Sequence, residues 1–229
     1  MGVAWGSKAL AITRYEVRNE IRSRAWWKLA TLLSSYFVLL TSYFPVSYFP
    51  IQTSAAGLDE RTLISHDFTT TAQGWLISGD TGLTAPEFNA TLGNPGGCIS
   101  NIDEALGETW YFRAPDSVLQ QLSAAEQGTL SFDLEQSADE PGFLDDDIVI
   151  VGPAGRLSYR FRSSPGTSWT PFSVRLSASA GWRWNWNAPA TQEQIRRVLQ
   201  DPTSLEIRGE YHTGPDIGRL DNVVLKTGA

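Results

Sequence analysis

The sequence contains few of the residues from which metal and catalytic sites are usually built. It has one cysteine, Cys98, and two histidines, His66 and His212, among 229 residues. A single cysteine excludes an intramolecular disulfide. Cys/His ligand clusters, the Gly-x-Ser-x-Gly nucleophile motif and the His-Glu-x-x-His zinc motif are absent. We therefore expect a non-catalytic protein with no organic cofactor, and we interpret both histidines as solvated or core residues.

Charge is missing from one stretch, because no Asp, Glu, Lys or Arg lies between Lys28 and Asp59. Within it, residues 25–44 are predominantly apolar, and as a helix they would span about 30 Å, the hydrocarbon thickness of a bilayer. Pro45 prevents a clean continuation of this helix. The pattern predicts a transmembrane helix over residues 25–44.

The predicted helix separates two regions of opposite charge. Residues 1–57 carry six Lys and Arg against two Glu, whereas the remainder carries 12 basic and 23 acidic residues. The positive-inside rule places the basic segment 1–24 in the cytoplasm. We expect a single-pass protein of the cell inner membrane, with residues 45–63 as a linker and residues 64–229 as a periplasmic or extracellular domain. So acidic a domain would repel a phosphate backbone, which argues against nucleic-acid binding.

Two features of this N-terminal region stay open. Residues 53–56 (Thr-Ser-Ala-Ala) could form a signal-peptide cleavage site, but the apolar run and the segment before it are both long for a signal peptide, which favours a retained anchor. Residues 9–24 read as an amphipathic helix, which either lies on the lipid surface or extends the transmembrane helix into water.

Aromatic residues cluster just after the predicted anchor, at Tyr43, Phe44, Tyr48 and Phe49. One interpretation is an aromatic belt at the membrane–water interface. The other is a docking surface for a neighbouring integral membrane subunit, because four rings exceed what one anchor needs.

From Leu58 onward, short β-rich runs alternate with turn residues about every ten positions, which is typical of a β-sandwich. Residues 116–126 are expected to form a short turn or helix, and Thr191–Leu199 a helix that opens with a capping box. The predicted strands cover residues 65–68, 75–78, 97–100, 110–113, 128–136, 147–151, 157–161, 170–175, 204–211 and 218–226.

Three tryptophans alternate in the segment Gly181–Asn187, at positions 182, 184 and 186. In an extended strand they would share one face and could form an aromatic platform for sugar rings or a protein partner. We expect Trp182 to be buried, and Trp184 and Trp186 to be partly exposed and available for ligand binding.

Six sequence blocks, taken in order, resemble the laminin B (laminin domain IV) family over about residues 64–226. This resemblance implies a jelly-roll β-sandwich related to galactose-binding-like and carbohydrate-binding modules, an adhesion or structural role, and no catalytic residues. The blocks are Gly93–Gly97, Thr109–Pro115, Gly128–Leu134, Ala188–Thr191, Leu205–Tyr211 and Gly218–Leu225.

The resemblance also suggests a structural calcium ion, because related sandwich modules often hold one where their first and last strands meet. Asp221 lies in a Leu-Asp-Asn-Val sequence similar to their closing motif, with Asp67 or Asp80 as candidate partners. An alternative is that Asp221 simply occupies a strand-entry turn. The consecutive Asp145, Asp146 and Asp147 point in alternating directions in a strand, so we interpret them as solubilising, edge-protecting residues.

Two functions follow from these observations. The first is a membrane-anchored binding or scaffolding protein that acts as an accessory subunit of a larger membrane complex, for example a respiratory or photosynthetic one. The alternative is a carbohydrate-binding module of the cell envelope that uses Trp184 and Trp186.

Overall fold

The computed structural model describes residues 60–229 except 80–81, 104–106 and 140–141. The predicted transmembrane helix, the basic segment before it and most of the linker lie outside the described residues. Among the residues that are described, no helix has both the length and the apolar character needed to cross a bilayer.

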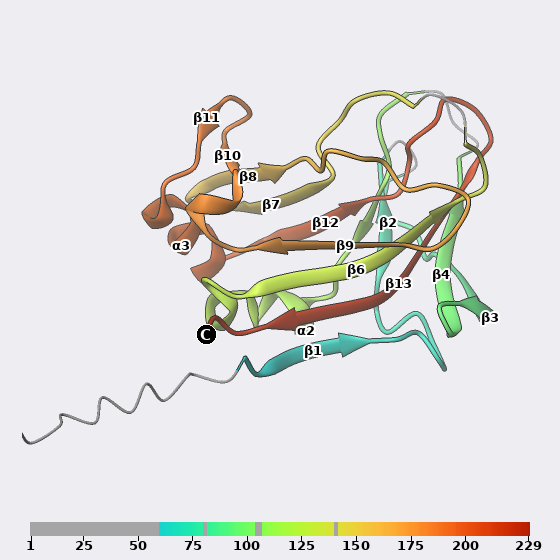
Figure 1. Cartoon of the computed structure of the whole chain (residues 1–229), viewed down its shortest axis with the longest axis horizontal. Helices are drawn as coiled ribbons and strands as arrows, with labels where there is room; N and C mark the ends of the chain where they lie inside the picture. The colour runs from blue at the N-terminus through green and yellow to red at the C-terminus, as the bar shows by residue number, and fades with distance from the viewer. Residues whose placement is uncertain (1–59, 80–81, 104–106, 140–141) are drawn as a thin grey trace, which may run out of the picture. The chain divides into compact units, whose positions relative to one another are not determined.

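The described residues form an all-β sandwich of two antiparallel sheets (Figure 1). The first sheet, here sheet A, has the order β3 (Glu87–Gly93), β4 (Gly96–Ile102), β13 (Ile217–Lys226), β6 (Thr129–Gln136) and β9 (Thr170–Arg175), and β1 (Thr62–His66) also pairs with β13. The second, sheet B, has the order β11 (Ala188–Pro189), β10 (Arg183–Trp184), β8 (Gly155–Tyr159), β7 (Ile148–Gly152), β12 (Ser204–Arg208), β5 (Tyr111–Arg113) and β2 (Leu76–Ser78).

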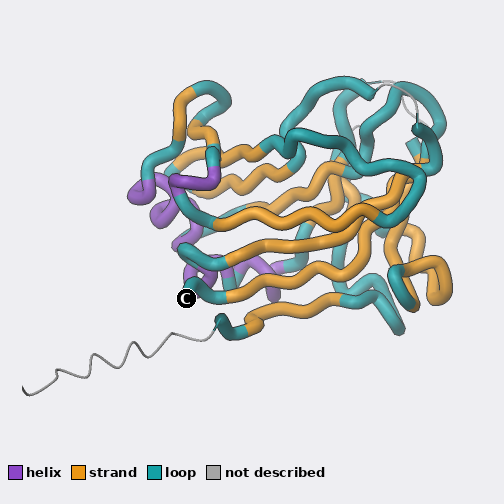
Figure 2. The backbone as a smooth tube through the Cα atoms, viewed as in Figure 1, coloured by secondary structure: helices purple, strands orange, loops and turns teal. Residues whose placement is uncertain are grey.

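Within the described part of the chain, four short helical elements accompany the sheets, and Figure 2 shows them gathered at one end of the sandwich. The predicted capping box of α3 is confirmed, because the Thr191 hydroxyl accepts from the backbone N–H of Gln194 while the Gln194 side chain accepts from the backbone N–H of Thr191. The elements are α2 (Asp116–Leu119), η1 (Leu122–Ala125), η2 (Ala178–Ala180) and α3 (Gln192–Gln200).

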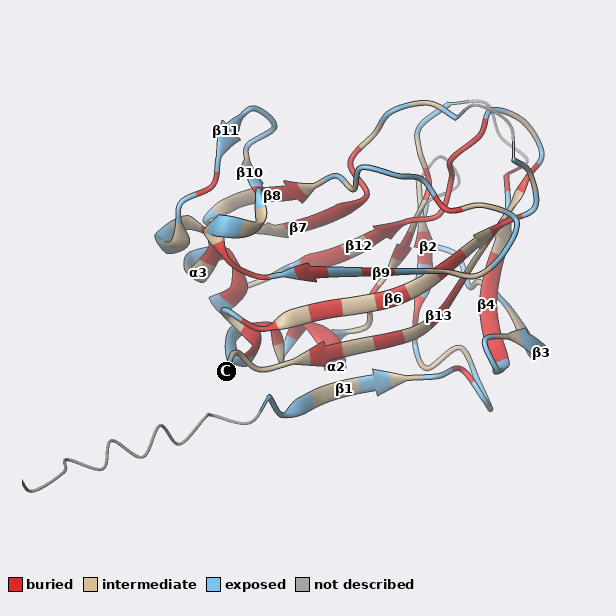
Figure 3. Cartoon of the chain, in the orientation of Figure 1, coloured by how far each residue is buried: buried red, intermediate tan, exposed pale blue. Residues whose placement is uncertain are grey.

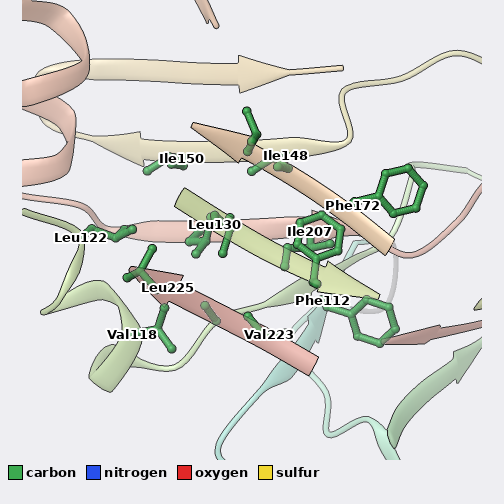
Figure 4. Packing of buried hydrophobic residues seen from close by; sticks show 14 of the residues in the cluster. Phe112, Val118, Leu122, Leu130, Ile148, Ile150, Phe172, Ile207, Val223 and Leu225 are labelled. Carbon is green, nitrogen blue, oxygen red and sulfur yellow. The ribbon is translucent and has the colours of Figure 1, made fainter. Parts of the chain in front are cut away.

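Alternation of apolar residues along the strands builds the core between the sheets. In β6, Leu130, Phe132 and Leu134 are buried while the residues between them are only half-buried. In the facing sheet, Ile148 and Ile150 point into the same core (Figure 4). All ten predicted strands overlap observed ones; β3, β10 and β11 were not predicted.

The last strand, β13, is the structural centre of sheet A. One of its edges pairs first with β4, through residues 217–220, and then with β1, through residues 223–226, while β6 pairs along the other edge. The register shifts between Asp221 and Val224, and Asn222 has a left-handed φ of 52°. The change of partner strand therefore occurs at Asp221.

Candidate ligand-binding face

On the outer face of sheet B, a row of side chains runs across neighbouring strands and points away from the core. Leu157 and Ile150 point into the core, so Ser158 and Val149, which alternate with them, lie on the opposite face. Strand register places Arg183 beside Ser158, Ser158 beside Val149, and Val149 beside Glu206. The row therefore runs across β10, β8, β7 and β12.

Ion pairs cover the middle of this face. Arg156 Nη1 lies 2.9 Å from Asp146 Oδ2, and Arg160 Nη2 lies 3.6 Å from Asp146 Oδ1. Because residues 156, 158 and 160 alternate along one side of the chain, the two arginines flank Ser158 on this face, and both reach the Asp146 carboxylate. This arrangement explains why Ser158 and Val149 are 0% and 4% exposed although they face away from the core.

A third cation, Arg208, is buried further along the same face and holds the loop before β7. Its guanidinium lies between the rings of Phe143 and Tyr211, at 4.6 and 4.3 Å from their centroids, and 3.6 Å from Asp147 Oδ1. Arg208 Nε also donates to the carbonyl oxygen of Glu210. Burial raises the pKa of Asp147, while the Phe161 N–H and Arg208 act in the opposite sense.

These contacts correct the interpretation of the acidic run as a solvated edge. Asp146 and Asp147 are both buried and each contacts an arginine, and Asp145 Oδ2 accepts a hydrogen bond from the Thr109 hydroxyl. Asp146 and Asp147 hold this loop onto the sheet because Arg156 and Arg160 on one side and Arg208 on the other supply their counter-charges.

The tryptophan segment does not form the expected platform. Trp182 is buried and its indole N–H donates to the carbonyl oxygen of Arg175, as expected for a core residue. Trp184 is half-buried with its ring against Gly155, where an added Cβ would lie 2.3 Å from the ring. The chain then reverses in the β10–β11 hairpin, and Trp186, which is 62% exposed, faces solvent more than the other two tryptophans. Figure 3 shows much of this hairpin as exposed.

The position of Trp186 is fixed by the hairpin turn and by β8. Asn185 and Trp186 have φ angles of +44° and +76°, both left-handed. Asn185 donates its N–H to the Arg156 carbonyl, and its side-chain oxygen accepts the Arg156 N–H. The Arg156 guanidinium lies 5.3 Å from the Trp186 ring centroid. The exposed indole is therefore held over the edge of the ion-pair network.

Trp186 is an unusual residue for its backbone conformation. A hairpin turn with two left-handed residues normally carries Asn-Gly, because a side chain in this conformation costs roughly 1–2 kcal/mol. Here a bulky indole stands where glycine is favoured, and most of it contacts solvent. Backbone strain of this kind clusters at functional sites, so Trp186 is a candidate binding residue.

Asp221 and Asp67, two of the residues predicted to bind calcium, already accept hydrogen bonds from neighbouring residues. Asp221 is fully buried, and its two oxygens accept the backbone N–H groups of Asn94, at 2.5 Å, and Asn222, at 2.6 Å. Asp67 accepts both the N–H and the hydroxyl of Thr69, and Asp80 lies outside the described residues. No group of three or more acidic, His or Cys residues suited to a metal occurs in the described part of the chain. The calcium site therefore stays a prediction.

What Asp221 does in this structure is to position the β3–β4 hairpin. Burial raises the pKa of Asp221 to about 6, and its hydrogen bonds to Asn94 and Asn222 oppose that effect. A Cβ on Gly93 would lie 2.0 Å from the Gly97 carbonyl oxygen and 2.8 Å from Asp221 Oδ2. The absence of side chains at the glycines thus allows this hairpin to close against Asp221.

A hollow of about 270 Å³ lies elsewhere, between α2, η1 and the end of α3. Asp116, Gln120, Ser123 and Asp201 are among its lining residues, and no aromatic side chain lines it. It therefore lacks a surface on which a sugar ring or an aromatic group could stack, and we place the candidate site on sheet B instead.

The other residues expected to bind ligands or partners, Tyr43, Phe44, Tyr48 and Phe49, lie outside the described residues, so the docking-surface interpretation stays a prediction. His66 accepts a hydrogen bond at Nδ1 from the indole N–H of Trp75, which is a structural role. Sequence reasoning missed Arg156, Arg160 and Arg183, although the Arg-x-Ser-x-Arg spacing at residues 156–160 is typical of one polar strand face.

Comparison with known proteins identifies the family. The family model for laminin B (Domain IV) matches residues 111–229, more than half of the chain. The chain belongs to the laminin B family. The L4b domain of human laminin alpha-2 superposes with a TM-score of 0.56 at 16% identity, covering 73% of this chain and 99% of that domain, so the two share a fold.

A family 11 carbohydrate-binding module from a Clostridium thermocellum cellulase is also similar, with a TM-score of 0.42 and 16% identity over 74% of this chain and 95% of the module. No curated protein sequence matches the chain. The N-terminal segment is not part of the family match.

Several residues that carry the resemblance have structural roles in this laminin B domain. The Trp110 ring lies over Gly209, where an added Cβ would meet it at 1.9 Å. The N–H of Trp110 donates to Glu210, and burial raises the pKa of that carboxyl to about 7. Gly218 of β13 also lies against the Trp110 ring and the Gly209 carbonyl, so blocks distant in sequence meet where sheet B contacts sheet A.

Proposed function

We propose that this laminin B domain is a non-catalytic module that binds a glycan on the outer face of sheet B. The observation that carries the proposal is Trp186, an indole held 62% exposed in a left-handed turn over the Arg156 guanidinium. Flat aromatic surfaces stack on the apolar faces of sugar rings, and tryptophan has the largest such surface.

Polar groups beside the indole support the same proposal. Arg156, Arg160 and Asp146 form a fixed network next to the ring, and Arg183 lies on the adjacent strand. Sugar hydroxyls both donate and accept hydrogen bonds, so a stacking surface flanked by guanidinium donors and a carboxylate acceptor suits them.

The test is affinity electrophoresis of the full chain in mild detergent through gels that contain single polysaccharides. Retardation by at least one polysaccharide is expected, and Trp186→Ala should abolish it. Leu83→Ala is the matched control, because Leu83 is also exposed but follows β2, at the opposite edge of sheet B. Equal retardation of wild type and Trp186→Ala would contradict the proposal.

We further propose that residues 25–44 anchor this domain in the cell inner membrane, with the N-terminus in the cytoplasm. The support is the length of the uncharged apolar run and the basic charge before it. The anchor would concentrate the binding face at the membrane surface.

A second function within this arrangement is that of an accessory subunit of a membrane complex. The aromatic residues between 43 and 49 favour it, since they follow the predicted anchor directly. Purification from membranes in mild detergent tests the idea: a stoichiometric integral membrane partner is expected, and recovery of a free monomer alone would contradict it.

A further inference from the structure

We propose that the ligand of the sheet B face is an anionic glycan, one that carries carboxylate or sulfate groups. This inference rests on the proposed function and adds the charge of the ligand to it. It is not what the composition suggests, because residues 58–229 carry 23 acidic and only 12 basic residues. The local charge around Trp186 has the opposite sign.

Arg183 supplies the first excess positive charge. Trp182 and Trp184, on either side of it, pack on the core, so Arg183 points to the outer face. Its register partner on β8 is Ser158, two residues from Arg156. Arg183 is exposed, and no carboxylate among the described residues forms an ion pair with it.

The network of Arg156, Asp146 and Arg160 supplies the second excess positive charge. Arg156 and Arg160 both pair with the single carboxylate of Asp146, at 2.9 and 3.6 Å, so these two arginines do not each have an acidic partner of their own. The other arginines of the face, Arg113 and Arg208, each have their own acidic partner, Glu206 and Asp147 respectively. The excess is therefore confined to the part of the face beside Trp186.

The floor of the same area holds an unused hydroxyl. Ser158 Oγ is buried and, within the described residues, has no hydrogen-bond partner. Guanidinium groups bind carboxylate and sulfate through paired, charge-assisted hydrogen bonds, which are stronger than those to neutral hydroxyls. A stacked sugar ring with an anionic substituent would place its ring on Trp186 and its charge toward Arg156, Arg160 and Arg183.

A pair of probes that differ only in charge separates this inference from the proposed function. The full chain in mild detergent is titrated with polygalacturonate and with its methyl-esterified form, and chondroitin sulfate serves as a sulfated probe. We expect at least one anionic polymer to bind about tenfold more tightly than the ester at low salt, with the difference shrinking as salt rises.

Charge variants test the residues. Arg183→Gln should weaken binding of the anionic polymer about fivefold and leave binding of the ester unchanged. Arg175→Gln is the matched control, because it removes the same charge from an exposed residue of sheet A. Tighter binding of polygalacturonate would identify carboxylate, and tighter binding of chondroitin sulfate would identify sulfate.

The two proposals fail in different ways. Equal affinity for polygalacturonate and its ester, lost in Trp186→Ala, overturns the anionic ligand and leaves glycan binding standing. Binding of no polysaccharide overturns both. Retention only on single-stranded DNA or on anionic lipid vesicles also overturns both, because it would assign the positive charge to a different class of partner.

Discussion

Replacing Trp186 with glycine should leave the stability of the domain nearly unchanged, and this result would distinguish a binding residue from a packing residue. Glycine relieves the left-handed conformation at φ +76°, a gain of roughly 1–2 kcal/mol. Loss of the contact with the Arg156 guanidinium removes about 0.5–1 kcal/mol. The greater freedom of glycine in the unfolded chain removes about 0.4–1 kcal/mol more.

These contributions nearly cancel, so the free energy of unfolding of Trp186→Gly should lie within about 1 kcal/mol of wild type. For a domain of this size, that corresponds to a change in Tm of no more than about 4 °C. Trp182 provides the contrast, because it is 1% exposed and donates its indole N–H to the Arg175 carbonyl. Trp182→Ala should lose about 3–5 kcal/mol.

Circular dichroism of the full chain in mild detergent, followed through thermal and urea unfolding, measures both variants against wild type. A fall in Tm for Trp186→Gly as large as that for Trp182→Ala would refute the reasoning, because the exposed ring would then be part of the packed fold. Loss of polysaccharide binding with unchanged Tm is the expected combination.

Three further results are expected. Burial raises the pKa of Glu210 to about 7 and of Asp221 to about 6, so between pH 4 and 7 the folded state binds more protons than the unfolded chain. The stability of the domain therefore falls as pH rises through this range. Urea unfolding should show a domain that is more stable at pH 5 than at pH 8, and the reverse order would contradict these assignments. If calcium binds at Asp221, as the family resemblance suggests, excess chelator should lower Tm by several degrees and Asp221→Asn should remove the effect, whereas an unchanged Tm would defeat the idea. If residues 25–44 are a retained anchor, the mature protein should stay in carbonate-washed membranes with its N-terminal segment intact, and a mature N-terminus near Ala56 would refute it.

The elements with a regular local pattern could be read from the sequence. The alternation of Leu130, Phe132 and Leu134 marked β6, and the Thr191–Gln194 capping box marked the start of α3. Both patterns depend on neighbours a few residues apart, so they can be recognised without knowledge of the fold. The β3 strand was not predicted because its half-buried residues, among them Phe88, do not alternate clearly with exposed ones.

The candidate site depended on contacts that no local pattern contains. Alternation alone placed three tryptophans on one face, but two consecutive left-handed residues turn the chain after Trp184 and leave only Trp186 exposed. A run of acidic residues resembled a solvated edge until the fold brought Arg156 and Arg208 onto it.

The sequence by itself determined the β-sandwich, the family and the acidic character of the domain, because short-range periodicity and residue composition are properties of the chain. Only the tertiary structure decided which charges remain unpaired and which ring faces solvent. Strand register brings β7, β8, β10 and β12 side by side, and the sign of the local charge follows from which arginines share a carboxylate across those strands.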